Sequence, residues 1–457
     1  MQGASLHHRT DPIKTPKETG VNSPSRAIGE ALPHKTRLNR EQIIGFWAAW
    51  SGWTLDGMDS VIFALVLVPA LKELLPLSGY AATPGVIGLA GSLMFALFLV
   101  GWGFSYIWGP LADRFGRVRV LAATTLFYAV FTGLAAISHN VWELAIFRFL
   151  AGVGVGGEWA LAGTYVAEAW PEDRRRAGAG YLQTGYYAGF FLASALNYTI
   201  GTHYGWRVMF LCGLLPVVVA LYTLLKVREP RKWKRTHSDA PVWAPSKRPL
   251  RDIFSKPYRQ RTIVNSVLVT VAILGLWGGS IYLPSAVIQL AERQGIDAIT
   301  AIKLASATTA IFSIGTIIVC LILPFLADRY GRRPTLAAYY ATAALFLVAG
   351  FGWAFYLQSG LVPFMALSFF IGLGGGNAAM YALWLPEQYP TSIRATAFAF
   401  STSIGRFFAA GVSLCLGMAV SHFGTLGVPI ALTASLFIVG IITLRWAIET
   451  RGKPLPD

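Results

Sequence analysis

Two aspartates stand three residues apart inside an apolar stretch that is long enough to cross a bilayer. Asp56 and Asp59 lie within residues 43–71, and about 20 helical residues span the hydrocarbon core. Residues at this spacing share one face of a helix, and a carboxylate at membrane depth is costly, rare and usually functional. The pair therefore indicates a path for a charged species, with the proton as the first candidate. The alternative is that the two acids cap a helix break at Gly57.

A single arginine marks a second membrane segment. Arg406 lies about ten residues into the apolar run 396–421, which places it about 15 Å deep at 1.5 Å per residue. A guanidinium there can hold a carboxylate through two parallel hydrogen bonds, so we expect Arg406 to bind an anionic substrate. The alternative is a resting-state ion pair with Asp56 or Glu158.

Carboxylates must carry any proton, because the histidines avoid the centres of the apolar runs. His139, His203 and His422 fall near the ends of such runs. Glu158 lies near the middle of the run 142–168 and is a further candidate proton carrier. The alternative for Glu158 is a permanently protonated, hydrogen-bonded acid.

Polar and aromatic side chains at similar depth could line a substrate cavity. Small-ligand sites are mostly apolar with a few placed polar groups, although any single aromatic residue here is more readily explained by packing than by ligand contact. The candidates for substrate contact are Arg406, Gln183, Tyr187, Asn377, Tyr381 and Trp277, and Tyr186, Tyr282 and Trp384 belong to the wider lining set.

Composition excludes a soluble protein. The chain is 54% hydrophobic and 13% charged, whereas a soluble domain carries about 25% charged residues. The net charge of +16 does not indicate nucleic-acid binding, because the basic residues gather in the tail and in alternate loops. Cys212, Cys320 and Cys415 lie in apolar segments with no His or Asp cluster nearby, so we expect no disulfide, no metal and no cofactor.

The apolar runs predict an all-α membrane protein of twelve transmembrane helices in two six-helix bundles. We expect a disordered tail over 1–42, a bundle over 43–227, a basic linker over 228–260, a second bundle over 261–448 and a short tail over 449–457. The predicted helices lie near 43–71, 84–108, 118–138, 142–168, 178–202, 207–227, 261–290, 299–325, 334–355, 360–385, 396–421 and 426–448.

Loop charges predict the orientation in the membrane. Arginines cluster at 114–119, 174–176 and 329–333, whereas the intervening loops are nearly free of such clusters. Cytoplasmic loops carry the excess of Lys and Arg. We therefore expect both termini in the cytoplasm and an even number of helices in a cell membrane, either inner or plasma membrane.

The two halves repeat three motifs in the same order. Leu-Ala-Asp-Arg-Phe-Gly-Arg at 111–117 matches Leu-Ala-Asp-Arg-Tyr-Gly-Arg at 326–332, and a glycine run at 152–156 matches one at 372–376. A glutamate and an arginine seven residues apart follow each glycine run. Repeated six-helix units are typical of alternating-access transporters, whose site lies at mid-membrane between the repeats.

These motifs resemble the loop signatures of the major facilitator superfamily. Gly-Pro-Leu-Ala-Asp-Arg-Phe-Gly-Arg at 109–117, its second copy, and Glu-Gln-Tyr-Pro followed by Arg394 carry the resemblance, which covers residues 43–450. Leu-Asp-Gly-Met-Asp at 55–59 and the run from Arg148 to Trp159 are similar to proton symporters of organic acids, including the aromatic-acid and the sialate and lactate groups. Trp53 favours the second group.

The resemblance implies roles for several charged residues. In related symporters the last acid of the first helix faces an arginine at this place in the fourth helix, so Asp59 and Arg148 are expected to form the coupling pair. The alternative is a static buried ion pair. Asp56, on the same face, would titrate together with Asp59 as a coupled unit, and most proteins of this fold are monomers.

The repeated loops are expected to act as gates. Asp113 and Asp328 sit at helix edges, where a carboxylate can meet the positive end of a neighbouring helix. With the Glu and Arg that follow each glycine run, they would latch the cytoplasmic side. The predicted gating set is Asp113, Arg117, Glu168, Arg175, Asp328, Arg332, Glu387 and Arg394.

The combined expectation is a secondary active transporter that moves a small organic anion, such as lactate, sialate or an aromatic acid, together with protons. A sugar or drug transporter of the same fold, or a sensor that binds nutrients without transporting them, remains an alternative. No nucleophile and base set, metal cluster or nucleotide domain points to an enzyme.

Overall fold

The computed structural model describes residues 37–230, 249–453, 455 and 456, with the side chains of 84, 85, 276–279 and 421 also outside the description. The predicted disordered tail lies almost wholly outside the described residues, as does most of the predicted linker. The described residues form one compact unit.

Helix starts follow the capping residues of the sequence. Asn39 and Gln42 form a reciprocal capping box at the start of α1, and the Asn140 side chain accepts from the Glu143 backbone at the start of α5. Such caps satisfy backbone donors that a helix leaves unpaired at its first turn. The helices of the first half are α1 (Arg40–Leu77), α2 (Pro84–Phe104), η1 (Ser105–Ile107), α3 (Trp108–Phe115), α4 (Arg117–Ala135), α5 (Val141–Ala169), α6 (Glu172–Leu196), η2 (Asn197–Gly201), α7 (Thr202–Cys212) and α8 (Pro216–Lys226).

The second half is also helical. It comprises α10 (Pro249–Asp252), α11 (Arg259–Ser280), α12 (Leu283–Arg293), α13 (Ala298–Tyr330), α14 (Arg332–Leu347), η3 (Val348–Trp353), η4 (Ala354–Tyr356), α15 (Leu361–Gly374), α16 (Asn377–Trp384), η5 (Pro386–Gln388), α17 (Arg394–Phe423), α18 (Gly427–Thr433), α19 (Ser435–Thr443) and η6 (Leu444–Trp446).

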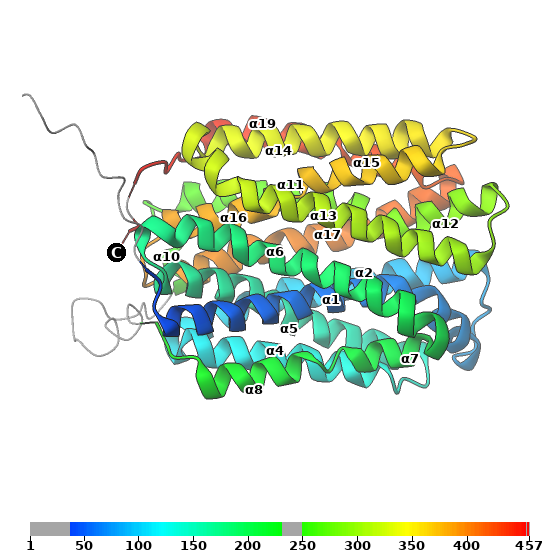
Figure 1. Cartoon of the computed structure of the whole chain (residues 1–457), viewed down its shortest axis with the longest axis horizontal. Coiled ribbons are helices and arrows are strands. Elements are labelled where there is room, and N and C mark those ends of the chain that lie inside the picture. The colour runs from blue at the N-terminus through cyan, green and yellow to red at the C-terminus, as the bar shows by residue number, and fades with distance from the viewer. Residues whose placement is uncertain (1–36, 231–248, 454, 457) are drawn as a thin grey trace, which may run out of the picture. The chain divides into compact units, whose positions relative to one another are not determined.

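These elements make twelve membrane crossings in two bundles, which confirms the predicted fold class. Ten helical runs of the described part are long and apolar enough to span a bilayer, and one of them, Glu172–Lys226, holds two crossings. The chain turns inside that run at Gly205, whose φ of 79° a residue with a side chain rarely adopts. The pair α11 and α12 supplies the remaining crossing (Figure 1).

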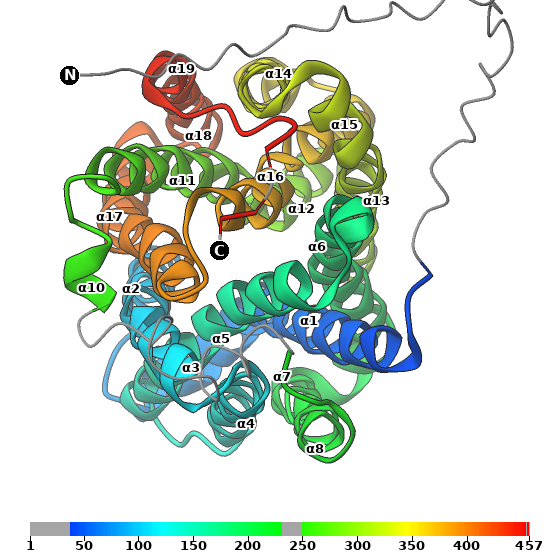
Figure 2. The same cartoon turned by 90° about the vertical axis from the view of Figure 1, so that its left-hand side faces the viewer.

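The two bundles meet along two seams. Helix α6 packs along α13, and α2 packs along α17. Figure 2 shows the helices from one end of the bundle, with these seams on either side of a central region bordered by α5, α6, α16 and α17. The end that faces the viewer carries the repeated loop motifs and is called the charged end below.

The glycine runs behave differently in the two halves. Helix α5 continues through its run, and a Cβ at Gly152 would lie 2.3 Å from the Phe98 carbonyl oxygen of α2. The predicted helix 360–385 is instead interrupted at Gly375 and Gly376, between α15 and α16. The three consecutive glycines have a low helix propensity. The Asn377 side chain donates a hydrogen bond to the Gly374 carbonyl oxygen at this break.

Candidate functional site

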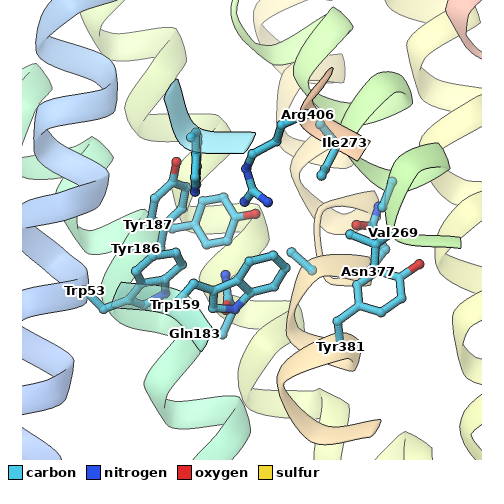
Figure 3. A pocket seen from close by; sticks show the side chains of 13 residues that line it. Trp53, Trp159, Gln183, Tyr186, Tyr187, Val269, Ile273, Asn377, Tyr381 and Arg406 are labelled. Atoms are coloured by element: carbon cyan, nitrogen blue, oxygen red, sulfur yellow. The ribbon is translucent and has the colours of Figure 1, made fainter. Parts of the chain in front are cut away.

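A cavity lies between the bundles at mid-height. Figure 3 shows aromatic side chains from α1, α5 and α6 on one side and residues of α11, α16 and α17 on the other. Five of the six predicted substrate contacts line this cavity, and the side chain of the sixth, Trp277, lies outside the described part of the chain. The full lining is Trp53, Trp102, Trp159, Gln183, Tyr186, Tyr187, Val269, Ala272, Ile273, Asn377, Ala378, Tyr381 and Arg406.

Arg406 enters the cavity from α17 and is only 3% exposed. No carboxylate within the described ranges lies within 4.0 Å of its guanidinium, so the resting-state ion pair with Asp56 or Glu158 is not formed here. The guanidinium carbon instead lies 3.8 Å from the ring centroid of Trp102 and 5.7 Å from that of Trp159. Cation–π contacts stabilise a buried cation while leaving its N–H groups available.

Aromatic rings form one wall of the cavity. Trp53 stacks on Tyr186 with centroids 4.5 Å apart and on Trp159 with centroids 6.0 Å apart. The indole nitrogens of Trp53 and Trp159 are buried and have no hydrogen-bond partner within the described chain. The wall therefore presents flat apolar faces together with unused donors.

Two amides supply the polar part of the lining. Gln183 is 1% exposed and Asn377 is fully buried, and the side-chain oxygen of each has no hydrogen-bond partner among the residues described. Tyr381 shares a hydrogen bond with Tyr340, and the Tyr187 hydroxyl donates to the Gly375 carbonyl oxygen at 3.5 Å. Tyr187 thus reaches from one bundle to the helix break of the other.

Two residues of the wider predicted set lie elsewhere. Tyr282 borders two other cavities beside α2, and the Trp384 indole donates to the Ile448 carbonyl oxygen at 3.0 Å.

Asp59 and Arg148 form a fully buried ion pair inside the first bundle. An Nη of Arg148 lies 3.5 Å from the Asp59 carboxylate, and both side chains have 0% exposure. The guanidinium carbon lies 4.3 Å from the ring centroid of Phe63 and 4.4 Å from that of Phe98. The Nε and the second Nη of Arg148 have no acceptor in the described structure, so aromatic faces replace hydrogen bonds around this cation.

Asp56 and Glu158 are buried, and neither forms an ion pair with a cation of the described residues. Both Asp56 oxygens lack hydrogen-bond partners among the described residues, whereas Glu158 accepts from the Thr125 hydroxyl at 2.7 Å. A Cβ at Gly52 would lie 2.0 Å from a Glu158 oxygen, so this glycine lets the acid reach α1. Helix α1 runs unbroken through Gly57, which excludes the alternative that the two aspartates cap a break.

The first loop motif closes into an ion-pair network at the charged end. Arg117 lies 2.6 Å from Asp113 and 3.2 Å from Glu168, and all three side chains are buried. In the second half, Arg332 lies 2.7 Å from Glu387 and 3.5 Å from Asp328.

Side-chain contacts of the described residues also link the two halves at this end. Arg394 lies 3.5 Å from Glu168, and the Thr396 hydroxyl donates to Asp113 at 2.7 Å. Arg176 pairs with Asp328 at 3.1 Å.

Arg175, a member of the predicted gating set, does not pair with the second half in the described structure. It pairs with Glu172 of its own helix at 3.3 Å. Its neighbour Arg176 makes the contact between the bundles, and the loop charge cluster does not reveal which of consecutive arginines faces the other half.

One glutamate follows the last helix of each half. It caps the start of the helix that comes directly after the repeated loop motif, which is α4 in the first half and α14 in the second. Glu229 accepts from the Val118 and Arg119 backbones at 3.0 and 3.2 Å, and Glu449 accepts from the Arg332 and Arg333 backbones at 3.0 and 3.1 Å. Burial raises the pKa of Glu229, and the hydrogen bonds only partly offset it. Burial acts in the same direction on Glu449, but there the backbone hydrogen bonds outweigh it and lower the pKa.

The C-terminal segment also enters the charged end. Leu455 is 5% exposed, and its backbone N–H donates to Glu172 of α6 at 3.3 Å. Arg394 donates to the Pro456 carbonyl oxygen. The segment therefore touches both halves, and Figure 2 shows the red part of the chain that leads to it lying across this face.

Several site residues were not predicted from sequence. Trp102 and Trp159 are ordinary apolar residues by composition, and only their contact with Arg406 identifies them. The capping glutamates had a weak signal, because each is an isolated acid directly after an apolar run.

Comparison with known proteins gives the chain its family. Residues 49–319 match the Major Facilitator Superfamily, and residues 248–457 match the family described as sugar (and other) transporter. A probable 4-methylmuconolactone transporter of Cupriavidus pinatubonensis is 29% identical, covering 89% of this chain and 90% of its own length. The sialic acid transporter NanX of Escherichia coli is 26% identical, covering 92% and 96%.

A solved structure shares the fold. The proton:xylose symporter XylE superimposes with a TM-score of 0.73 at 19% identity, covering 91% of this chain and 98% of its own. With the helix order, the repeated loop motifs and the cavity between two bundles, these matches show that the chain belongs to the Major Facilitator Superfamily.

Proposed function

We propose that this chain is a secondary active transporter that moves a small organic anion together with protons by alternating access. The observation that carries the proposal is Arg406, a buried guanidinium in the cavity between the bundles with no carboxylate within 4.0 Å in the described chain. A carboxylate substrate would supply the missing counter-charge and could accept two parallel hydrogen bonds. The relatives named as transporters of a muconolactone and of sialic acid support an organic acid.

The balance of buried charge supports proton coupling. Away from the charged end, the buried carboxylates of the described chain are Asp56, Asp59 and Glu158, and its buried cationic side chains are Arg148 and Arg406. An anionic substrate adds a further negative charge to this excess. Because charges out of water are costly, binding of the anion favours protonation of at least one of these acids.

Asp59 is the acid best placed to link protonation to movement. When it is ionised, Arg148 holds it within the first bundle at 3.5 Å. When Asp59 is protonated, its attraction to Arg148 is lost. The protein with bound substrate then buries less net charge when it changes conformation. Release of the proton on the other side restores the pair, and Arg406 releases the substrate.

The contacts at the charged end support a state closed on that side. We propose that this side is cytoplasmic, that the halves 43–227 and 261–448 rock as units in the cell membrane, and that one monomer is sufficient for transport. Opening toward the cytoplasm then requires the Glu168–Arg394, Asp113–Thr396 and Arg176–Asp328 contacts to separate.

Uptake into proteoliposomes tests the coupling. Labelled lactate, benzoate and sialic acid are offered with and without an inward proton gradient to the wild type, to Asp59→Asn and to Asp297→Asn, a matched change at an exposed helix cap. We expect Asp59→Asn alone to lose gradient-driven accumulation while it still exchanges substrate across the membrane. Full accumulation by Asp59→Asn shows that the coupling assignment is wrong.

Arg406→Ala tests the anion site separately. We expect it to lose the thermal stabilisation that the transported acid gives to the wild type, whereas Arg207→Ala, an exposed arginine paired with Glu73, retains it. Equal stabilisation of Arg406→Ala and wild type contradicts the assignment of Arg406.

A further inference from the structure

Asn377 presents a hydrogen-bond acceptor of fixed orientation to the cavity. It is the first residue of α16, directly after the helix break, and it is fully buried. Its side-chain nitrogen donates to the Gly374 carbonyl oxygen at 3.0 Å. Rotating the amide by 180° would set two oxygens against each other, so the backbone of the break determines which atom of Asn377 is left over.

The remaining atom, Oδ1, has no hydrogen-bond partner anywhere in the described chain. Gln183, on the opposite bundle, leaves its Oε1 unpaired in the same cavity. A buried polar atom without a partner is costly, and such an atom at a ligand site is usually satisfied by the ligand. Water can serve these oxygens while the cavity is empty, but a bound substrate displaces that water.

The cavity therefore has two kinds of polar partner. Arg406 and the unpaired indole nitrogens of Trp53 and Trp159 are donors, which suit a carboxylate. Asn377 Oδ1 is an acceptor, which a carboxylate cannot satisfy, whereas the Gln183 amide can turn either its oxygen or its nitrogen toward a ligand. Figure 3 shows Arg406 and Asn377 reaching the cavity from separate helices of the second bundle.

We propose that Asn377 selects substrates that carry an O–H or N–H donor in addition to the carboxylate. The inference rests on the proposed function, since it assumes that the carboxylate is held by Arg406. An acid with such a donor can pair its carboxylate with Arg406 and donate a hydrogen bond to Asn377 Oδ1. An acid without one buries Asn377 Oδ1 unpaired, and sites built to hydrogen-bond a substrate group strongly reject analogues that lack it.

Matched pairs of acids test the proposal directly. Benzoate is compared with 3-hydroxybenzoate and 4-hydroxybenzoate, and propionate is compared with lactate. Binding to the purified full chain is followed by tryptophan fluorescence, because Trp53, Trp102 and Trp159 line the cavity. We expect a hydroxylated member of at least one pair to bind about tenfold or more tightly than its partner, in keeping with the cost of an unmade buried hydrogen bond.

Asn377→Leu and Asn377→Ala remove the acceptor in two ways, one filling the space and one emptying it. We expect both to reduce the hydroxyl preference to about threefold or less while benzoate or propionate binds as well as before. Retained binding of the plain acid shows that the variant is folded. Asn265→Leu is the control, because Asn265 is a buried amide that bonds Gln388 and Tyr389 outside the cavity.

The outcomes separate the two proposals. A wild type that binds both members of every pair equally, or an Asn377→Leu variant that keeps the preference, overturns the role of Asn377 and leaves carboxylate transport standing. A wild type that binds none of these acids contradicts carboxylate transport itself, and the role of Asn377 with it.

Discussion

Glu168 and Arg394 join the two bundles at the charged end. The Arg394 guanidinium lies 3.5 Å from the Glu168 carboxylate, and neither side chain is exposed. Glu168 also pairs with Arg117 of its own half at 3.2 Å. One carboxylate thus serves a contact within the first half and a contact between the halves. In the proposed transport cycle the second contact breaks while the first persists.

Neutralising Glu168 is expected to weaken closure at the charged end. Glu168→Gln leaves Arg394 and Arg117 buried with less counter-charge, and removing one partner of a buried pair costs about 3–5 kcal/mol. We expect a lower melting temperature and faster modification of a cysteine placed next to the interface, for example at Ala399. Glu143→Gln, at a partly exposed glutamate that pairs with His139 at the start of α5, is the control. Equal labelling rates in Glu168→Gln and wild type would show that this pair does not hold the end closed.

The C-terminal segment is expected to contribute to the same closure. Leu455 is buried and touches α6 through its backbone, while Pro456 accepts from Arg394. Leu455→Ala removes buried apolar contact worth about 2 kcal/mol at the low end of the usual range. We expect about tenfold faster cysteine labelling at the charged end, whereas exposed Lys453→Ala leaves the rate unchanged. A slower rate in Leu455→Ala contradicts a closing role for this segment.

Much of this arrangement was predictable because membrane segments follow from apolar runs. The run that holds Asp56 and Asp59 is α1, and Arg406, whose position along its helix predicts a mid-membrane depth, lines the cavity. The thickness of the hydrocarbon core determines the length of a spanning helix. The repeated loop motifs predicted that the chain consists of two related halves.

The remainder depended on contacts that no local pattern encodes. The two glycine runs are similar in sequence, yet only the run at 372–376 interrupts its helix, where Asn377 takes up a backbone oxygen. Trp102 lies among many aromatic residues of similar character, and its contact with Arg406 joins residues about 300 positions apart in the chain. Tertiary packing determines both which glycine run breaks its helix and which aromatic residue contacts Arg406.

The two capping glutamates are expected to respond to acid in opposite ways. The lowered pKa of Glu449 means that its ionised form is favoured in the folded chain. Its contribution is full above the ordinary pKa of 4.5 and is lost as the pH falls through the lowered value. The raised pKa of Glu229 means that the folded chain binds the proton more readily than the unfolded chain. Stability from Glu229 therefore increases as the pH falls through the raised value toward 4.5.

Melting temperatures measured from pH 7 to pH 3 test the direction of both effects. We expect the advantage of the wild type over Glu449→Gln to shrink at the acid end and its advantage over Glu229→Gln to grow. The same trend in both variants contradicts the assignment of at least one glutamate.

Phe63 is expected to control access of water to the Asp59–Arg148 pair. Its ring lies over the Arg148 guanidinium, with centroid and guanidinium carbon 4.3 Å apart, and it also borders a second cavity between α1, α2 and α12. Helix α1 runs away from the charged end toward this cavity, so Phe63 stands between the buried pair and the opposite face of the protein. We expect a ring in this position to keep water away from Asp59.

Phe63→Ala removes this barrier, and we expect proton flux without substrate. The flux is followed with a pH-sensitive dye trapped in proteoliposomes under a potassium diffusion potential. Leu67→Ala is the matched control, because Leu67 borders the same cavity one turn further along α1. Adding Asp59→Asn to Phe63→Ala should abolish the flux, since the proton would then have no acceptor at the pair. Proton flux that persists in the double variant shows that the proton takes another path. A Phe63→Ala variant without proton flux shows that the ring is not the barrier.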